Sequence, residues 1–478
     1  MIADLKPYPA MKNSGAPWLG QVPEHWDVLP NRALFDEIKD RDRPDEQMLS
    51  VTIKGGVIRQ AALLQDTSKK DSSNLDRSNY KLVRPGDIVY NKMRAWQGAV
   101  GVSDYRGIVS PAYVVQRPRA GAVSRYFHHL LRTPGFAKEA ERWSYGITSD
   151  MWSLRPEHFK MIYACLPALP EQTAIVRYLD YVERRVRRYI QAKQRLIGLL
   201  EEQKQAIIHR AVTRGLEPDV PLKPSGVEWL GDVPEPWEVR RLKSLLAARV
   251  TDGPHTTPTF LSEGIPFLSV DGIQHGELVF DNCRYVSPED HAEFQEKAAP
   301  RRNDILLGKA ASTGKIARVK VEFEFSIWSP LALIRPRASL VHSAFLEYAL
   351  KDVSAQAQVE ILCTSNTQKN ISMADIPRLT VPLPPLHEQG AIVEHLHKAT
   401  ADIDTAIDRT RRELELIREY RTRLIADVVT GKLDVREAAA NLPHEPDEPE
   451  PLDEIDDLTD ESDGLADDLD AVPLEVEV

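Results

Sequence analysis

The sequence repeats itself once, and this duplication constrains the fold more than any other feature. Three kinds of segment occur twice in the same order, namely SGAPWLGQVPEHWDV (14–28) with SGVEWLGDVPEPWEV (225–239), LPALPEQTAIVRYL (166–179) with LPPLHEQGAIVEHL (383–396), and AVTRGL (211–216) with VVTGKL (428–433). Partners lie about 215 residues apart, so the chain is predicted to be two copies of one structural unit. Small differences in that spacing place insertions inside each unit, between its matching ends.

Each unit begins with a globular part of mixed α and β structure. Short β-rich runs such as DIVY (87–90) and LALI (331–334) are separated by glycine and proline, which is typical of strands joined by turns. A proline-rich stretch and a Glu-Gln pair then open the second part of the unit. Proline before a helix and glutamate in its first turn both favour a helix start at this point.

The second part of each unit is one long amphipathic helix. Apolar residues recur at helical steps, at Ile175, Leu179, Val182, Val186, Ile190, Ile197, Leu200 and Ile207 in the first copy and at Ile392, Leu396, Ala399, Ile403, Ile407, Leu414, Ile417 and Leu424 in the second. A helix of about 40 residues is roughly 60 Å long, and a single apolar stripe of that length needs a partner stripe. The two helices are therefore expected to pack on each other.

The connection between the copies predicts how the helices run. Only the short linker EPDVPLKP separates the first helix from the second globular part, so that part lies at the C-terminal end of one helix and the N-terminal end of the other. The expected fold is α+β, with two mixed α/β domains separated by a pair of long antiparallel coiled-coil helices and related by pseudo-twofold symmetry. The predicted segments are 1–165 and 216–382 for the domains, 166–215 and 383–436 for the helices, and 437–478 for an acidic disordered tail.

The net charge of −11 hides a basic body. Residues 437–478 contain 17 Asp and Glu and no Lys or Arg, so removing those 17 from the 72 acidic residues leaves 55 against 61 Lys and Arg, a net +6. A mildly basic body is compatible with a polyanionic partner such as DNA.

Other features indicate a cytoplasmic protein. The three cysteines, Cys165, Cys283 and Cys363, are far apart, so neither a disulfide framework nor zinc-ligand spacing is expected. No run approaches the 18 apolar residues of a membrane span, and the N-terminal residues lack the apolar core of a secretory signal.

The sequence contains no recognisable catalytic motif. The nearest match to a phosphate-binding loop is GKAASTGKI (308–316), but it has five residues between its glycines where four are needed. Ile316 then follows the lysine, where the magnesium-binding hydroxyl should stand. Dinucleotide, amino-methyltransferase, metalloprotease and serine-hydrolase motifs are also absent from the sequence. These absences favour a binding protein with no metal site over an enzyme.

The duplicated S-G-x-x-W-L-G-x-V-P-E-x-W opening and the duplicated L-P-x-L-x-E-Q junction together resemble the specificity subunits of Type I restriction-modification systems. This resemblance covers roughly residues 10–436. It implies that each globular part is a target-recognition domain for one half of a split, double-stranded DNA site. It also implies that the helices set the gap and bind two N6-adenine methyltransferase subunits, and that nuclease and translocase subunits join them. S-adenosylmethionine, ATP and magnesium would then belong to those partners. A coiled-coil scaffold that joins proteins without reading DNA is the alternative.

Base reading needs donors, acceptors and planar groups on loops, flanked by cations for phosphates. In the first domain, Lys92 and Arg94 are predicted to meet phosphate or guanine, Gln97 to pair with adenine, and Trp96 to pack on a sugar-phosphate edge. A core position for Trp96 is the alternative. The further candidates in this domain are Lys54, Arg59, Tyr145 and Ser149.

The second domain offers a different set of polar side chains. Its predicted DNA-binding residues are His255, Thr256 and Thr257, then Lys309, Ser312, Thr313 and Lys315, and finally Ser365, Asn366, Gln368, Lys369 and Asn370. The 309–315 stretch corresponds to 91–98 in the first copy. The helices and junctions of the two copies are alike while these polar stretches differ, which is the pattern expected of two domains that read different half-sites. Simple sequence drift is the alternative.

Overall fold

A computed structural model describes residues 5–61, 77–146, 152–363 and 369–443 of the chain. The protein divides into two compact units, and each is described by itself below. The first unit comprises residues 1–192 with 413–478, and the second comprises residues 193–412. None of the helices in the described ranges combines the length and the apolar character that a membrane span requires.

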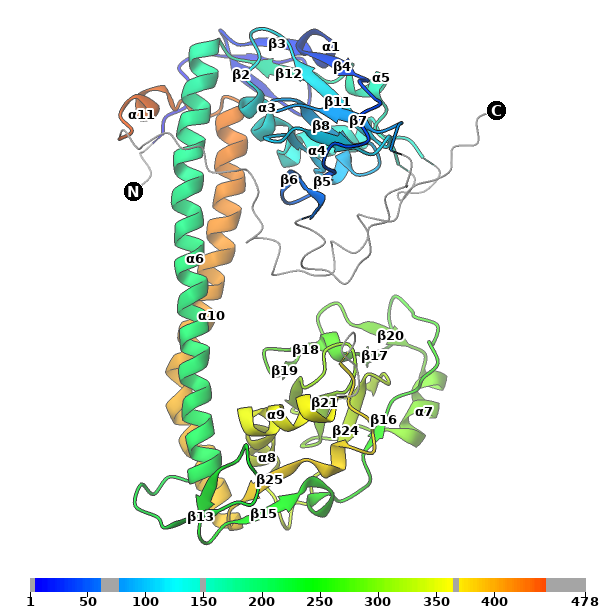
Figure 1. Cartoon of the computed structure of the whole chain (residues 1–478), viewed down its shortest axis with the longest axis vertical. Helices are drawn as coiled ribbons and strands as arrows, with labels where there is room; N and C mark the ends of the chain where they lie inside the picture. Colours follow the sequence, from blue (N-terminus) through cyan, green and yellow to red (C-terminus); the bar gives the residue numbers. More distant parts are fainter. Residues whose placement is uncertain (1–4, 62–76, 147–151, 364–368, 444–478) are drawn as a thin grey trace. The chain divides into compact units, whose positions relative to one another are not determined.

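The first unit is built around a four-stranded antiparallel sheet in the order β4-β11-β8-β9 (Figure 1). Three two-stranded pairs, β1-β2, β3-β12 and β5-β6, and a fourth, β7-β10, surround it. The strands are β1 Met11–Asn13, β2 Gln21–Pro23, β3 Asp27–Pro30, β4 Phe35–Ile38, β5 Leu49–Thr52, β6 Gly56–Arg59, β7 Lys81–Val83, β8 Ile88–Asn91, β9 Val100–Val102, β10 Gly107–Val109, β11 Tyr113–Pro118 and β12 Tyr163–Leu166. The short helices are α1 Asn31–Leu34, η1 Ala95–Gln97, α3 Ser124–Leu131, α4 Pro134–Arg142, α5 Pro156–Phe159 and α11 Arg436–Ala440.

The second unit repeats the central part of this topology and adds a three-stranded sheet in the order β20-β17-β23. Its four-stranded sheet has the order β16-β24-β21-β22, and the pairs β13-β14 and β15-β25 match β1-β2 and β3-β12. The strands are β13 Leu222–Pro224, β14 Asp232–Pro234, β15 Glu238–Arg241, β16 Thr251–Asp252, β17 Ile265–Leu268, β18 Ile273–Gln274, β19 Glu277–Leu278, β20 Arg284–Val286, β21 Ile305–Gly308, β22 Ile316–Arg318, β23 Ser326–Ile327, β24 Leu331–Ile334 and β25 Thr380–Leu383. The short helices are η3 Leu242–Leu245, η4 Val270–Gly272, α7 Pro288–Lys297, α8 Ser343–Lys351, α9 Val353–Leu362 and η5 Ile376–Arg378. The predicted α+β fold with an internal repeat is therefore confirmed.

Two long helices, α6 Leu169–Arg214 and α10 Leu386–Val429, contribute a segment to each unit. In the second unit, Lys204 pairs with Asp404 and Glu201 accepts a hydrogen bond from Arg411 at 2.9 Å. Contacts that advance along α6 thus move backward along α10, so the segments run antiparallel, as predicted. The helix segments of the first unit also run antiparallel. The Tyr189 hydroxyl, late in the α6 segment, contacts Glu413 at the beginning of the α10 segment, whereas the start of α6 lies near the end of α10 (Figure 1).

The repeated Glu-Gln pair has a structural role at the start of each long helix. Gln172 and Gln389 are both fully buried. The Gln172 side chain accepts from the Val123 amide at 2.8 Å and donates to the carbonyls of Gly121 and Pro167 at 2.9 and 2.8 Å. Gln389 makes the matching set of three bonds in the second unit. A buried amide with every bond satisfied fixes the angle at which the helix leaves its domain.

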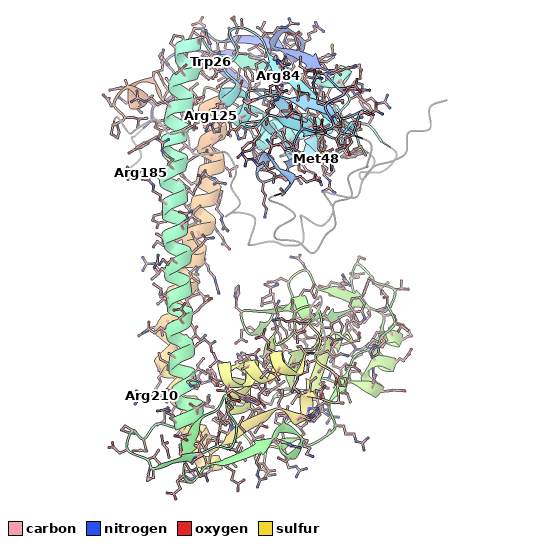
Figure 2. The ribbon with its side chains drawn as sticks, viewed as in Figure 1. Trp26, Met48, Arg84, Arg125, Arg185 and Arg210 are labelled. Carbon is pink, nitrogen blue, oxygen red and sulfur yellow. The ribbon has the colours of Figure 1, made fainter. Side chains whose placement is uncertain are left out.

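The repeated tryptophan motif packs against the end of the other long helix. Trp26 lies beside the helix ends in the first unit (Figure 2). A Cβ at Gly431, just after α10, would lie 2.2 Å from Pro23 and 3.0 Å from Trp26. In the second unit, a Cβ at Gly215, just after α6, would lie 3.1 Å from Trp237. Both glycines have positive φ, +76° and +74°, and so end their helices in the left-handed conformation.

The second long helix ends earlier than the predicted residue 436. It stops at Val429, because Gly431 turns the chain and the amides of Lys432 and Leu433 bond back to the Asp427 carbonyl at 2.8 and 3.2 Å. The short helix α11 then occupies Arg436–Ala440, where the sequence predicted the beginning of the tail. Residues 444–478 of that predicted tail lie outside the described residues.

Candidate nucleic-acid interface

The turn at residues 91–98 of the first unit is held by its own hydrogen bonds. It begins at the end of β8, where Asn91 Oδ1 accepts from the Met93 amide at 3.0 Å. Trp96 Nε1 donates to the Met93 carbonyl at 2.9 Å, and Gly98 ends the turn with φ of +97°. Side chains between these anchors are therefore presented from an ordered backbone, which precise recognition requires.

Both units fasten this turn at the same point. In the first unit, the Leu154 amide donates to the Lys92 carbonyl at 2.9 Å. In the second, the Ile371 amide donates to the Lys309 carbonyl, also at 2.9 Å. We call this pair of bonds the turn clamp. Because the clamp is the same while the neighbouring side chains differ, the two turns are equivalent in backbone and different in chemistry.

The exposed side chain of the first turn is Gln97, whereas Lys92, Arg94 and Trp96 are half-buried. Trp96 packs edge-on against Trp152, with ring centroids 5.5 Å apart. Its indole N–H is already used inside the turn. Trp96 therefore supports the turn from within, which agrees with the alternative interpretation, and its contact with a sugar-phosphate edge stays a prediction.

Several backbone groups of the turn between β5 and β6 are already hydrogen-bonded within the first unit. The Gly55 amide donates to Thr52 Oγ1 at 2.9 Å, so it is not available to an anion. The carbonyls of Ile53 and Lys54 instead accept hydrogen bonds from the Arg132 guanidinium. The Lys54 side chain is exposed, and its contact with DNA stays a prediction.

A buried carboxylate organises the matching surface of the second unit. Asp252 Oδ1 lies 2.7 Å from Lys297 Nζ, and Oδ2 lies 2.7 Å from Lys309 Nζ and 3.2 Å from His255 Nε2. Burial alone would raise the pKa of Asp252, but the bonds from the two lysines lower it below its usual value. The carboxylate is therefore charged at neutral pH and fixes both ammonium groups.

This ion pair changes the interpretation of Lys309. Its side chain is only 13% exposed and is committed to Asp252, so the structure places it under the surface as a support. Direct phosphate contact would require breaking a buried ion pair, which is costly. The neighbouring Lys315 is exposed and Ser312 is half-buried.

The loop after Asp252 presents three of the predicted residues to solvent. His255, Thr256 and Thr257 are all exposed. The loop leaves the sheet at Gly253, where a Cβ would lie 1.8 Å from the Ile327 carbonyl oxygen, so only glycine fits. The polar residues of this loop are thus carried by a rigid base.

The segment that begins at Lys369 joins the same surface. Thr313 donates to the carbonyls of Lys369 and Lys309. Lys369 pairs with Glu360, and this bond raises the pKa of the lysine. Asn370 is exposed. In the second unit the structure thus brings together the 252–258, 309–315 and 369–371 segments.

Some predicted residues lie at the edges of what the structure describes. Tyr145 is 60% exposed, and its ring lies against His158 with centroids 4.9 Å apart, while its backbone pairs with Ser153. This arrangement suits an aromatic contact at the surface. The predicted residues Ser149, Ser365, Asn366 and Gln368 lie outside the described residues.

Comparison with known proteins bears on this surface. Residues 234–416 match the family model described as the Type I restriction modification DNA specificity domain. A protein of Methanocaldococcus jannaschii assigned as the type I restriction enzyme MjaX specificity subunit is 24% identical, over 87% of this chain and 96% of its own length. The type I restriction enzyme EcoBI specificity subunit of Escherichia coli is 23% identical over 66% of this chain and 67% of its own length.

The fold has a solved counterpart. A chain in the structure "Structural basis underlying complex assembly and conformational transition of the type I R-M system" superposes with a TM-score of 0.57 at 18% identity, covering 86% of this chain and 99% of that one. The family model matches most of the second unit, from residue 234 onward, and the four-stranded sheet of the first unit has its counterpart in the second. This chain is therefore similar to the specificity subunits of Type I restriction-modification systems. The names specificity subunit and recognition domain are used below in the sense of this similarity.

Each recognition domain of the specificity subunit also carries an arginine stacked on aromatic rings. The predicted residue Arg59 lies 4.4 Å from the centroid of the Tyr105 ring. Arg284, which sequence reasoning missed, lies 4.7 Å from Phe260 and 5.4 Å from Trp328. Stacking holds a planar guanidinium in place while leaving its N–H groups available for guanine or phosphate. The sequence carried no signal for Arg284, because its aromatic partners come from distant segments.

We expect Arg284→Ala to weaken binding of the specificity subunit's complex to its own site by about tenfold to a hundredfold, the loss of one good arginine contact. Arg284 is exposed, so the folded chain should tolerate the change. The check is a fluorescence-anisotropy titration with the cognate duplex, with Arg302→Ala as the control, since that arginine pairs with exposed Glu322. Equal affinities for Arg284→Ala and wild type would remove Arg284 from the interface.

Proposed function

We propose that the specificity subunit reads a bipartite, asymmetric double-stranded DNA site, with one recognition domain on each half-site. The observation that carries this proposal is the turn clamp: one backbone arrangement at Lys92 and Lys309 presents different side chains in the two domains. Base reading needs polar side chains on loops next to a rigid support. Two such surfaces of unequal chemistry suit two unequal half-sequences.

The two long helices set the gap between half-sites and bind the methyltransferase subunits. Supporting this, apolar side chains remain exposed on both helices. In the first unit, Leu416 and Tyr420 of α10 are 66% and 42% exposed, and in the second unit Leu196 and Leu199 of α6 are 40% and 54% exposed. Exposed apolar residues that recur along a helix favour a protein partner. Restriction subunits with nuclease and translocase activity join the resulting core.

The specificity subunit is not itself an enzyme. Methyl transfer to adenine N6, DNA cleavage and ATP-driven translocation belong to the partner subunits, which bind S-adenosylmethionine, ATP and magnesium. Some of the residues gathered at the two turns support the turns, and the others offer hydrogen-bonding groups for recognition. The complex works on DNA in the cytoplasm.

Adenine methylation across a whole genome tests this function. A host that expresses the partner methyltransferase is sequenced with and without this chain. A split, asymmetric site methylated only when the chain is present is the expected result. Methylation that is unchanged by the chain, with both proteins expressed and the methyltransferase active, would favour the coiled-coil scaffold.

A further inference from the structure

A buried lysine lies beneath the reading turn of the first recognition domain. Lys81, on β7, is only 8% exposed. Its ammonium group donates to the Pro111 carbonyl at 3.0 Å and to the Tyr113 carbonyl at 2.6 Å. A lysine is rarely buried so far without a carboxylate, because removing its charge from water is costly. Two carbonyls of one short segment are therefore being held by a cation at a considerable energetic cost.

The segment that Lys81 holds is the one against which the reading turn is built. Ala112, between the two bonded carbonyls, accepts a hydrogen bond from the Lys92 amide. Tyr113 is also the β-partner of Asn91, the residue from which the turn departs. The turn clamp from Leu154 holds the other side of Lys92. The backbone of Lys92 is thus fixed from two sides, and Lys81 orders one of them.

We propose that Lys81 is a positioning residue for the half-site read by the first domain, a proposal that rests on the function given above. It touches no DNA itself. Its two charge-assisted hydrogen bonds hold the 111–113 segment and, through that segment, set the place from which residues 92–97 meet the base edges. Loss of its charge should lower discrimination at one half-site and leave the other unchanged.

The surroundings of Lys81 make this device sensitive to alkaline pH. Burial, as the largest cause, and the positive charges of Lys92, Arg41 and Lys39 together lower the pKa of Lys81 from 10.5 to about 8, while Glu37 opposes them. The paired strand β10 carries no titratable side chain. The Lys81 charge is therefore present at pH 7 and largely absent at pH 9. A phosphate near Lys92 would raise the pKa, so DNA binding and protonation of Lys81 favour each other.

Folding stability changes in the opposite direction over this range. Since the folded-state pKa is the lower one, the unfolded chain binds more protons between pH 8 and 10.5, and the contribution of Lys81 to stability rises with pH in that window. Weaker discrimination at pH 9 could not then be attributed to unfolding around Lys81. This opposition separates a positioning role from a purely structural one.

The second domain supplies an internal control, because it orders its turn by other means. There the Asp252 carboxylate binds Lys297 and Lys309 directly. The lowered pKa of Asp252 keeps that carboxylate charged at neutral and alkaline pH. Discrimination at the second half-site should therefore be the same at pH 7 and pH 9.

The test measures binding of the complex of this chain with its methyltransferase subunits to three duplexes, at pH 7 and pH 9. The duplexes carry the site that the methylation sequencing proposed above identifies, the same site with one half substituted, and the same site with the other half substituted. Discrimination is the ratio of dissociation constants. The discrimination of wild type should fall by about threefold to tenfold between pH 7 and pH 9, and at one half-site only. This is the size of effect expected when a charge-assisted hydrogen bond is weakened.

Two variants complete the test. Lys81→Met should lose about tenfold discrimination at that same half-site at both pH values. Lys81→Arg keeps a cation that does not titrate in this range and should show no difference between pH 7 and pH 9. Equal discrimination at both pH values in wild type, or a loss spread over both half-sites, would overturn the role of Lys81. Failure of the wild-type complex to prefer the methylated site would instead overturn the proposed function.

Discussion

Replacing Gly431 by alanine should lower the free energy of unfolding of the chain by about 3 kcal/mol or more. The φ of +76° costs an L-residue ~1–2 kcal/mol. The new Cβ would also lie 2.2 Å from Pro23 and 3.0 Å from Trp26. Both neighbours belong to a buried cluster that cannot move aside freely, so overpacking adds a further ~1–3 kcal/mol. Urea unfolding followed by tryptophan fluorescence measures the loss.

Gly20 is the matched control. Its φ of +66° resembles that of Gly431, but nothing lies within 4 Å of the position that its Cβ would take. Gly20→Ala should therefore cost only the backbone term, about 1 kcal/mol. If the two variants lost the same stability, packing of the helix end against the tryptophan motif would add nothing to the effect of the backbone. This packing would then not explain why the helix end and the tryptophan motif are both repeated in the sequence.

The second large effect is expected at Asp252. Asp252→Asn removes the carboxylate shared by Lys297 and Lys309 and leaves the ammonium group of Lys309, whose side chain is only 13% exposed, without it. Breaking a buried ion pair on one side costs about 3–5 kcal/mol. Because Lys309 begins the reading turn of the second domain, affinity for the second half-site should also fall, on the order of tenfold. Calorimetric unfolding and the half-site binding assay measure the two losses.

Glu238→Gln is the control for that variant, since Glu238 and its partner Arg240 are 58% and 40% exposed. An exposed pair contributes less than about 1 kcal/mol, so this change should leave stability and DNA binding nearly unaltered. If Asp252→Asn behaved like Glu238→Gln, the buried carboxylate would have no organising role.

The pH dependence of the Asp252 effect has a definite sign. The folded-state pKa of Asp252 is lowered below 3.8, so its contribution to stability is present above the unfolded value and is lost as pH falls through the folded value. The difference in stability between wild type and Asp252→Asn should be constant at neutral pH. This difference in stability should shrink only in acid, where the carboxyl group of Asp252 is protonated and is therefore uncharged, like the amide that replaces it.

Periodicity and repetition predicted the architecture well. The structure confirms the two long helices, their antiparallel direction and the duplicated domain. These features depend on apolar periodicity, which is local, and on segments that recur in the same order, so both can be recognised in the sequence. The predicted end of the second helix at residue 436 was wrong because Gly431, with its positive φ, turns the chain just after Val429. That conformation is invisible in a pattern of apolar positions.

The candidate site was predictable only in outline. The 91–98 and 309–315 turns were found because polar residues follow a β-rich run in both copies. The burial of Lys309 was not, since its partner Asp252 is 57 residues away in sequence. Sequence reasoning did not single out Lys81 for the same reason. Whether a lysine faces DNA or a buried acceptor depends on tertiary contacts, which residue type alone does not reveal.

The most direct test of the account exchanges the two turns. In one variant, residues 91–98 are replaced by the sequence of residues 308–315, and the adenine methylome is sequenced in the presence of the partner methyltransferase. The account predicts that one half of the recognised site changes, while the other half and the gap between them stay as they are in wild type. A site that changes in both halves, or an unchanged site in a complex that still methylates, would contradict the assignment of one half-site to each domain.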